Sequence, residues 1–586
     1  MSRDLFAKAA IAQIPKILTL LDRNPHSPTY GCFDRNFWHY KIIDFPSGMS
    51  QEFVWPLALV YALPLPDNPY YQQASIKAWV DAGILYAARS AHADGSCDDY
   101  FPFERAGGAA AFSLLACIES YTLLGLHNPD VLDFFEQRAD WLAHHQESGR
   151  LTNHQALIVL CLELIGRLME TTKWNKAKQQ RLRQVLSWQD SEGWFQEYEG
   201  CDPGYHTLTI SCLARYYEIV CAKPPLNPSF AGGNFGAISS PSEQTSQRQG
   251  EDHNGVEPDL LKQLKDAIAK ATQLASHFVH PDGSYGGEYT SRNTYNFFPH
   301  GFELVGKWLP EALNINDRFL RGLAHQKEAC YADDHIIGHH TWNYLLTWQD
   351  FVNARPPLKP KSDQRFWLPN ARLLVDRRGD TELFLALNKG GVLKAFKGDR
   401  LLLSDTQFSL QVKSGTGVKN AVGHLVGPYD IQVEPDRILI QGALGWAKQK
   451  QMTPLNLMIL RGVMFTVGRF FPNLIRSLLQ KVLITGKKPT PFRFSRELRW
   501  HNESKDGSND RWQDSQTDGY WQVTDELHAE SWRNVVSVGM GCDQTSIYVV
   551  MSRTFQASQL QPWLDLTKEV RQLPDGVPLK VERSLR

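Results

Sequence analysis

The sequence of 586 residues has almost no net charge, because 62 Lys and Arg balance 63 Asp and Glu. This balance gives no general case for a nucleic-acid-binding protein, and we predict no nucleic-acid partner. The nine cysteines form no Cys-x-x-Cys pair and show no metal-ligand spacing. We therefore predict reduced, buried thiols, no metal site and no cofactor. No uncharged apolar run reaches the length of a membrane span.

Signals for secretion and for two common enzyme classes are also missing. The stretch from Met1 to Lys8 carries charge where a signal peptide has its apolar centre, so we expect a cytoplasmic protein. Gly-x-Ser-x-Gly and phosphate-loop signatures are absent, which argues against a serine hydrolase and a nucleotide enzyme. Aromatic residues, by contrast, are plentiful. Many stand beside Gly, Asp and His in loop-like sequence, as in clefts that stack sugars on aromatic rings.

Residues 4 to about 350 have apolar residues at helical spacing, separated by loops rich in Gly, Pro, Asp and aromatics. An acidic residue followed by Gly recurs at Asp94, Glu192 and Asp282, which indicates a weak internal repeat of helical hairpins. An open helical solenoid has the same periodicity but does not explain these loops. We predict an α/α toroid over residues 1–355, in which residues 223–258 form a mobile loop of low complexity.

After a Pro-rich segment at 356–360 the pattern changes to short runs typical of β-strands. We predict an antiparallel β-sandwich over residues 361–586, with an apolar, basic insert at 444–496. Residues 437–496 contain eleven Lys and Arg and no Asp or Glu. One prediction is that the insert packs on the toroid, with the long aliphatic parts of its Lys and Arg side chains lying over apolar surface. The alternative is that it contacts a membrane surface or an anionic glycan.

Two polar clusters stand at the starts of predicted helices, about fifty residues apart. Asn153 and His154 open one apolar run, and Tyr205 and His206 open another after an Asp-Pro-Gly turn. Taken singly, the first pair is a helix cap, and the tyrosine is a packing residue at a turn. On one rim of a toroid, the two clusters would instead combine an amide, an imidazole and a phenol in one site.

These groups are the set that β-elimination next to a uronate carboxylate requires. The proton on the carbon beside the carboxylate is only weakly acidic, so the carboxylate must first be hydrogen-bonded or neutralised. An Asn amide can donate to it, a His can donate or act as base, and a Tyr can return a proton to the leaving oxygen. We therefore predict a lyase that cleaves an anionic, uronate-containing oligo- or polysaccharide.

An Asn-His pair that opens a toroid helix, a Tyr about fifty residues later and a β-sandwich after the toroid resemble the heparinase II/III-type and oligoalginate-lyase families of polysaccharide lyases. The resemblance implies that Asn153 and His154 handle the carboxylate and the base step and that Tyr205 is the general acid. Those families also draw a His or Arg from the sheet domain or the last toroid loops. No single residue of this sequence clearly matches that part.

Arg292 is the best candidate for a clamp on the substrate carboxylate, because a guanidinium matches a carboxylate bidentately. The alternative is an Arg that ties its loop to neighbouring acids. Possible contributions from the sheet domain are His424, His501 and His528. The remaining predicted substrate contacts are Trp194, Glu197, His206, Tyr289, Asn293, His300, His339 and Trp342.

Other function classes compete for the same rim. A glycoside hydrolase would need two carboxylates across the cleft, for which the loops offer Asp98, Asp99, Glu104, Glu192, Glu197, Asp282 and Glu288. A non-catalytic glycan-binding or polysaccharide-assembly protein needs only the aromatic loops, and a terpenoid-cyclase-like toroid would need Asp clusters that are absent. His335 and His339 stand four residues apart, but Gly338 between them and the lack of a following Glu argue against a metal pair.

Overall fold

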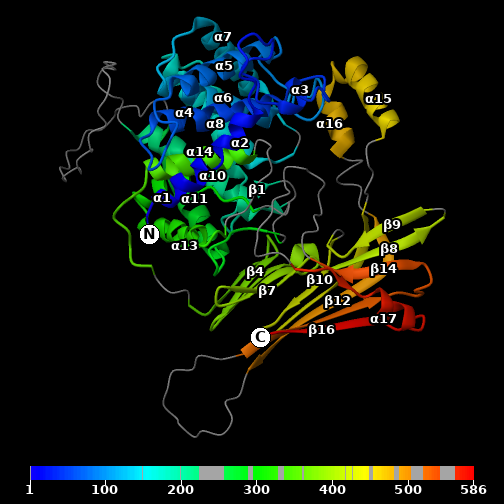
Figure 1. The fold of residues 1–586 in the computed structure, drawn as a ribbon. Coiled ribbons are helices and arrows are strands. Elements are labelled where there is room, and N and C mark those ends of the chain that lie inside the picture. The colour runs from blue at the N-terminus through cyan, green and yellow to red at the C-terminus, as the bar shows by residue number, and fades with distance from the viewer. Residues whose placement is uncertain are drawn as a thin grey trace.

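A computed structural model shows a helical N-terminal part followed by antiparallel sheets (Figure 1). The predicted combination of an α/α toroid and an antiparallel β-sandwich is therefore confirmed. Most of the predicted mobile loop, up to residue 255, lies outside the described residues. The structure describes residues 2–147, 149–197, 200–222, 256–287, 289, 295–327, 336–358, 362–415, 417–424, 427–447, 453–480, 488–502, 519–541 and 561–586.

The helices of the first domain form a closed double ring. Each inner helix packs on the next one along the chain, and the last packs back on the first. The inner helices are α4 (Val54–Ala62), α6 (Gly107–Leu123), α8 (Thr152–Leu168), α10 (Pro203–Cys221), α12 (His300–Gly306) and α14 (Ile336–Gln349). The outer helices are α5 (Ala74–Ser90), α7 (Pro129–His144), α9 (Asn175–Ser187), α11 (Pro258–Ala275), α13 (Leu313–Ala324) and, against α13 and α14, α1 (Asp4–Ile11).

Composition separates the two rings. Inner helix α6 begins with Gly-Gly-Ala-Ala-Ala and buries fourteen of its seventeen residues, because other helices cover it on both sides. Outer helix α9 buries only four of thirteen and leaves its polar face to solvent. Shorter elements complete the domain: α2 (Ile14–Leu20), α3 (Arg35–Trp38), η1 (Gly48–Phe53), the strands β1 (Gln196–Glu197) and β2 (Gly200–Cys201), η2 (Ser276–Phe278) and η3 (Pro310–Ala312).

Two of the three recurring acidic-Gly loops share one geometry. The carboxylates of Asp94 and Asp282 each accept a hydrogen bond from the backbone N–H two residues later, at 3.1 and 3.0 Å. The glycines that follow have φ of +82° and +81°, the left-handed region that glycine adopts without strain. A Cβ on Gly95 would lie 2.5 Å from the backbone of Arg138, and one on Gly283 would lie 2.4 Å from Gly322. Glycine at these turns therefore lets the loops pack directly on outer helices.

The second domain consists of two antiparallel sheets packed face to face. In the described residues, one sheet follows chain order: β3 (Gln364–Leu368), β4 (Leu373–Arg378), β5 (Thr381–Ala386), β6 (Val392–Lys397) and β7 (Arg400–Asp405). The other has the order β15-β14-β8-β9-β11-β12-β13-β16, with β10 beside β11. Its strands are β8 (Phe408–Ser414), β9 (Gly417–Val422), β10 (Asp430–Val433), β11 (Arg437–Ala447), β12 (Pro489–Asn502), β13 (Gly519–His528), β14 (Val535–Met540), β15 (Leu564–Asp565) and β16 (Leu579–Leu585).

The central strands β4, β5 and β6 of the first sheet are buried on both faces. Leu383 and Leu393 share an apolar core with the other sheet. On the opposite face, Phe384 and Phe396 join the core of the helical domain, where the ring of His280 lies 4.6 and 5.1 Å from theirs. The first sheet is therefore the layer of the sandwich that packs on the toroid.

A helical segment interrupts the sandwich between β11 and β12. It contains α15 (Pro454–Val463), the π-helical turn η5 (Met464–Gly468) and α16 (Pro472–Gln480). The first and last residues of the predicted insert 444–496 thus belong to the flanking strands. Figure 1 shows α15 and α16 beside the toroid, near α3 and away from the strands. Contact with the toroid is one of the two alternatives predicted for this insert.

A buried ion cluster holds the sandwich together. Arg496 is fully buried and donates to Asp525 at 2.6 Å and to Asp405 at 2.8 Å, while Arg583 bridges the same two carboxylates from β16. Burial alone would raise the pKa of Asp405, but the charges of the two arginines hold it well below its usual range. The cluster ties β12, β13 and β16 to the end of β7.

Replacing Arg496 by Met is expected to destabilise the sandwich by about 3–5 kcal/mol, because two buried carboxylates would share one remaining arginine. Urea unfolding followed by tryptophan fluorescence measures the loss. Arg499→Met is the matched control, since Arg499 lies on the same strand with a side chain that is 56% exposed. Its pair with Glu497 is exposed to solvent, so its replacement should cost much less stability than that of Arg496. Equal losses for the two variants would contradict this interpretation.

Candidate functional site

The first turns of α8 and α10 meet at one rim of the toroid, because the hairpin β1–β2 ties them together. Thr152 donates its hydroxyl hydrogen to the carbonyl of Gln196. The backbone N–H of Asn153 donates to the carboxylate of Glu197 at 2.6 Å. Both acceptors belong to β1, and the paired strand β2 leads directly into α10. The hairpin thus fixes the start of α8 against the start of the neighbouring inner helix.

Tyr205 lies in the first turn of α10. The carboxylate of Asp202 caps this helix by accepting from the N–H groups of Gly204 and Tyr205, at 2.9 and 3.1 Å. The tyrosine is 7% exposed, so it lies at the surface of the core. Since α8 and α10 pack on each other, His154 and Tyr205 occupy the first turns of adjoining helices at the same rim. The structure thereby brings together the two predicted polar clusters.

Asn153 lies behind this rim. It is 0% exposed, and its amide Nδ2 donates to Glu197 Oε2 at 2.9 Å. Its carbonyl Oδ1 is buried and has no hydrogen-bond partner within the described residues. Glu197, a predicted substrate contact, is likewise fully buried and serves here as the acceptor for Asn153. A direct bond from either residue to a substrate stays a prediction.

His154 is held by a carboxylate that precedes α8. Its Nδ1 lies 2.7 Å from Glu147 Oε2, and the side chains are 16% and 2% exposed. The other oxygen of Glu147 accepts from the N–H of Gly108 at 3.2 Å. A Cβ on Gly108 would come within 2.5 Å of the His154 ring, so the Gly-Gly start of α6 makes room for the imidazole. With Nδ1 occupied, Nε2 is the ring atom left to act on a ligand.

A second histidine–carboxylate pair lies across the ring from the first. His339 on α14 donates from Nδ1 to Glu52 at 2.7 Å, and the indole N–H of Trp342 donates to the same carboxylate. The ring of Phe112 stacks on His339 at 4.0 Å and meets His154 edge-on at 6.4 Å. Phe112 therefore separates the two imidazoles, and all three rings belong to inner helices.

Other predicted substrate contacts have structural partners elsewhere. Trp194 donates its indole N–H to Glu192, which also accepts from the backbone of the sheet domain at Asn370. The hydroxyl of Tyr289 lies 3.0 Å from His280 Nε2 at the same domain interface. Both aromatic residues therefore lie where the toroid meets the sandwich.

Two further predicted histidines lie below or behind the rim. His206 is 1% exposed and donates from Nε2 to the carbonyl of Ala271 on outer helix α11. The imidazole of His300 pairs with Asp350 at 2.7 Å, and the backbone N–H of His300 donates to the side chain of Asn343, half-way along α14. The start of α12 thus lies deeper in the ring than the starts of its neighbours. The predicted residues Arg292 and Asn293 lie outside the described residues.

Replacing His206 by Gln is expected to reduce the loss of stability in acid. Burial lowers the pKa of His206 to about 4, so the unfolded chain binds a proton more readily than the folded one. The stability that the neutral His206 contributes is complete above the unfolded pKa of about 6.5, and it falls by about 3 kcal/mol as the pH drops to about 4. Urea unfolding at pH 7.5 and pH 4 should therefore show a larger decrease for the wild type than for His206→Gln. Equal decreases would show that this imidazole is not kept neutral by the fold.

The carboxylates that a glycoside hydrolase might use are engaged by the chain itself. Six of the seven predicted candidates lie in the described part, and each accepts hydrogen bonds that hold a loop or a helix start. The donors are Phe103 and Arg105 N–H for Asp98, Ser47 for Asp99, Tyr100 N–H for Glu104, Asn370 and Ala371 N–H for Glu192, Asn153 for Glu197, and Ser284 for Asp282. These carboxylates therefore stabilise loops and helix starts in the folded chain.

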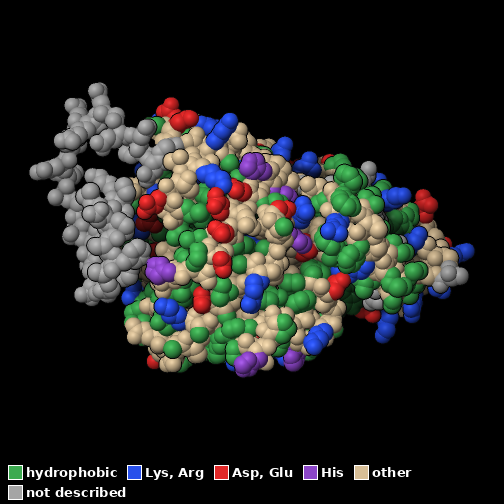
Figure 2. All heavy atoms as spheres, turned by 90° about the horizontal axis from the view of Figure 1, so that it is seen from above, with side chains coloured by type: hydrophobic (Ala, Val, Ile, Leu, Met, Phe, Trp, Pro, Cys, Tyr) green, Lys and Arg blue, Asp and Glu red, His purple; other side chains and the backbone are tan. Residues whose placement is uncertain are grey.

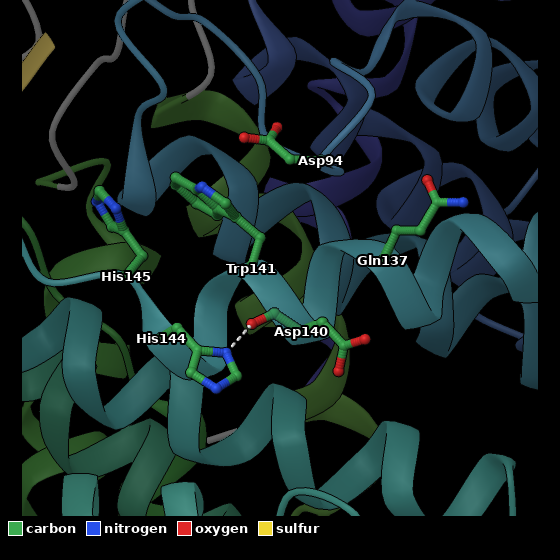
Figure 3. A pocket seen from close by; sticks show the side chains of 6 residues that line it. All are labelled: Asp94, Gln137, Asp140, Trp141, His144 and His145. Atoms are coloured by element: carbon green, nitrogen blue, oxygen red, sulfur yellow. Dashed lines mark hydrogen bonds between the residues drawn. The ribbon is translucent and has the colours of Figure 1, made fainter. Parts of the chain in front are cut away.

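A hollow of about 490 Å³ lies outside the ring, against α7 (Figure 3). Trp141 and His145 stack at 4.1 Å beside it, and the other residues that line it are Asp94, Gln137, Asp140 and His144. None of the residues predicted from the sequence as catalytic or substrate-binding lines it. Across the described ranges, no three His, Cys, Asp or Glu side chains are grouped so that they would hold a metal ion.

Comparison with known proteins yields similarity in fold. No family model and no curated protein matches the sequence. Among solved structures, a Paenibacillus xanthan lyase matches with a TM-score of 0.48 and 11% identity over 99% of this chain and 56% of its own, so this chain spans little more than half of that enzyme. A Streptomyces coelicolor A3 chondroitin AC lyase in complex with chondroitin sulphate matches with a TM-score of 0.47 and 10% identity, over 100% of this chain and 79% of its own.

An unsaturated glucuronyl hydrolase specific for heparin is also similar, with a TM-score of 0.38 and 8% identity over 60% of this chain and 96% of its own. The TM-scores of these three structures all lie below 0.5. At such identities the likeness concerns the fold alone, and the chemistry has to be argued from the residues of the rim.

Proposed function

We propose that this protein is a lyase that cleaves a uronate-containing oligo- or polysaccharide by β-elimination. The observation that carries the proposal is the pairing of two first turns: His154, held by Glu147, opens α8, and Tyr205 opens the adjoining helix α10. An oriented imidazole and a phenol at the starts of adjoining helices supply a base and an acid without a nucleophile.

In the proposed reaction, Nε2 of His154 takes the proton from the carbon beside the uronate carboxylate. The C–O bond at the next carbon breaks, a C=C bond forms, and the Tyr205 hydroxyl gives its proton to the leaving oxygen. Glu147 stabilises the imidazolium because its carboxylate lies 2.7 Å from Nδ1. The imidazolium then releases its proton to solvent, and the phenolate takes up a proton from solvent. Both groups are thereby restored.

We further propose that Asn153 and Arg292 bind the carboxylate of the substrate. The Asn153 amide carries a second Nδ2 hydrogen beside the one donated to Glu197. Its bond to Glu197 fixes the start of α8, so Asn153 also orients His154. Arg292 is proposed as the cation that neutralises the carboxylate, which a bidentate guanidinium would do most effectively.

Hydrolysis with two carboxylates is the main competing mechanism. It is disfavoured because the described rim carboxylates already accept hydrogen bonds from backbone and side-chain donors. A general acid for glycoside hydrolysis must instead reach the glycosidic oxygen.

Incubation with a panel of uronate-containing oligosaccharides tests the proposal. Elimination produces a double bond conjugated with the carboxylate, which absorbs in the ultraviolet, and we expect this absorbance to rise with at least one substrate. Reducing ends that form without the absorbance would establish hydrolysis. Saturable binding of an oligosaccharide with neither signal would establish a glycan-binding protein.

A further inference from the structure

The helical insert between β11 and β12 exposes an unusually apolar surface. Of the nineteen large hydrophobic side chains that are exposed in the described part of the chain, ten lie between residues 455 and 478. Helix α15 has no buried residue at all. The most prominent side chains are Leu455, Met458, Ile459, Phe470, Phe471 and Leu474. Exposed apolar patches of this kind mark surfaces that bind a partner.

A small number of contacts fix the insert to the toroid and leave this surface outward. Arg461 pairs with Asp44 at 2.8 Å and lies over the ring of Phe45. The rings of Phe465 and Phe103 meet edge-on at 5.3 Å. Figure 2 shows apolar side chains gathered on this side of the molecule, with Lys and Arg among them. The contacts involve the inner side of the insert, so the two helices present their other sides to the surroundings.

The charge of the insert indicates which kind of partner its apolar surface binds. Residues 448–488, between the two flanking strands, carry eight Lys and Arg and no acidic residue, although the whole chain is nearly neutral. In the described part of the insert, Arg469 is exposed and lies over the ring of Phe103. Long basic side chains beside Phe, Leu, Met and Ile match an interface between anionic headgroups and acyl chains.

We propose that α15 and α16 form a peripheral membrane-docking hairpin, which buries its apolar side chains in the headgroup region of an anionic lipid bilayer. Helices of ten and nine residues are too short to cross a bilayer. Nowhere in the described ranges is there a helix long and apolar enough to do so. The hairpin therefore lies on the membrane, and it does so whatever reaction the rim of the toroid performs.

A lipid surface fits better than a protein partner because the apolar residues are not confined to one face. In α15, Leu455, Leu457, Met458 and Ile459 are all exposed, and consecutive residues on a helix point in different directions. A groove on a folded partner would cover one stripe of such a helix, whereas a fluid headgroup layer surrounds it. A neutral protein partner would also give no reason for the insert to lack acidic residues.

Vesicle sedimentation of the full-length protein tests the proposal. We expect binding to vesicles of phosphatidylcholine and phosphatidylglycerol, at least about ten-fold weaker binding to phosphatidylcholine alone, and weakening by high salt. The variant Phe470→Ser/Phe471→Ser removes two of the most exposed rings and should lower partitioning at least about ten-fold. Val577→Ser, at an exposed apolar position on the sandwich, is the control and should bind like the wild type.

Three outcomes would overturn the proposal. They are the absence of wild-type binding to anionic vesicles, equal binding of the double variant, and a wild-type dimer that the double variant loses while neither binds vesicles. Circular dichroism and urea unfolding of the double variant exclude misfolding, which is not expected at side chains that are 72% and 60% exposed. Elimination activity is measured separately on soluble oligosaccharides, so failure of either proposal leaves the other testable.

Discussion

Replacing Tyr205 by Phe should abolish detectable elimination, lowering kcat by about 10²- to 10⁴-fold, while the protein stays folded. The change removes only the hydroxyl, and the ring keeps its position in the first turn of α10. The cap of that helix is unaffected, because Asp202 bonds to backbone N–H groups. The ultraviolet assay measures the activity, and circular dichroism with urea unfolding measures the fold.

Tyr285→Phe is the matched control for this prediction. Tyr285 is buried, and its hydroxyl donates to the carbonyl of Pro203 at 3.2 Å, so it lies beside the start of the same helix. Loss of that bond should cost about 1 kcal/mol of stability and leave most of the activity. A fully active Tyr205→Phe enzyme, or equal losses of activity in the two variants, would rule out Tyr205 as the acid.

Replacing His154 by Ala should lower kcat by about 10²- to 10⁴-fold, because the base that removes the proton is lost. Glu147→Gln should lower it by a smaller factor, of at least about ten. The amide keeps the imidazole in place but provides no negative charge to stabilise the imidazolium. The pH dependence of kcat in Glu147→Gln separates a positioning role from a structural one, since its acidic limb, which reports deprotonation of the base, should move to lower pH while the unfolding midpoint stays close to that of the wild type.

His92→Gln is the control for this pair. His92 lies 2.9 Å from Asp98 in another rim loop, so it is also a histidine held by a carboxylate, and no role in the reaction is assigned to it. It should retain most of the activity. If His92→Gln and His154→Ala lost activity equally, the effect would reflect the integrity of the rim and not base catalysis.

The toroid was predictable because its signals are local and repeated. Acidic-Gly turns at Asp94 and Asp282 have the same geometry, and each brings a loop onto an outer helix. The starts of α8 and α10 were predictable for the same reason, since a polar cluster ahead of an apolar run marks a helix start. Local patterns thus located Asn153, His154 and Tyr205 at one rim.

The partners of these residues were not predictable, because tertiary packing selects them. Glu147 belongs to the turn after α7, and nothing in its neighbourhood marks it as the acceptor for His154. Glu52 and His339 are 287 residues apart, and only closure of the ring brings them together. Tyr289 is predicted as a substrate contact, and its sequence neighbours do not show that its hydroxyl and ring contact His280 and Phe384 at the domain interface.

The insert between β11 and β12 illustrates a different limit. Its composition showed an apolar and basic segment, which suits both a packed insertion and a membrane surface. Only the exposure of individual side chains distinguishes the two, because Met464 is buried whereas Phe470 is 72% exposed. In the fold, the insert has a few contacts to the toroid and an outward apolar surface.

The mass of the products formed from one uronate oligosaccharide tests elimination at this rim most directly. Elimination adds no water, so the two fragments together should have the mass of the substrate, and the fragment with the double bond should absorb in the ultraviolet. Both signals should be lost in Tyr205→Phe. Fragments that together carry one additional water, or identical products from Tyr205→Phe at the wild-type rate, would contradict the proposed reaction.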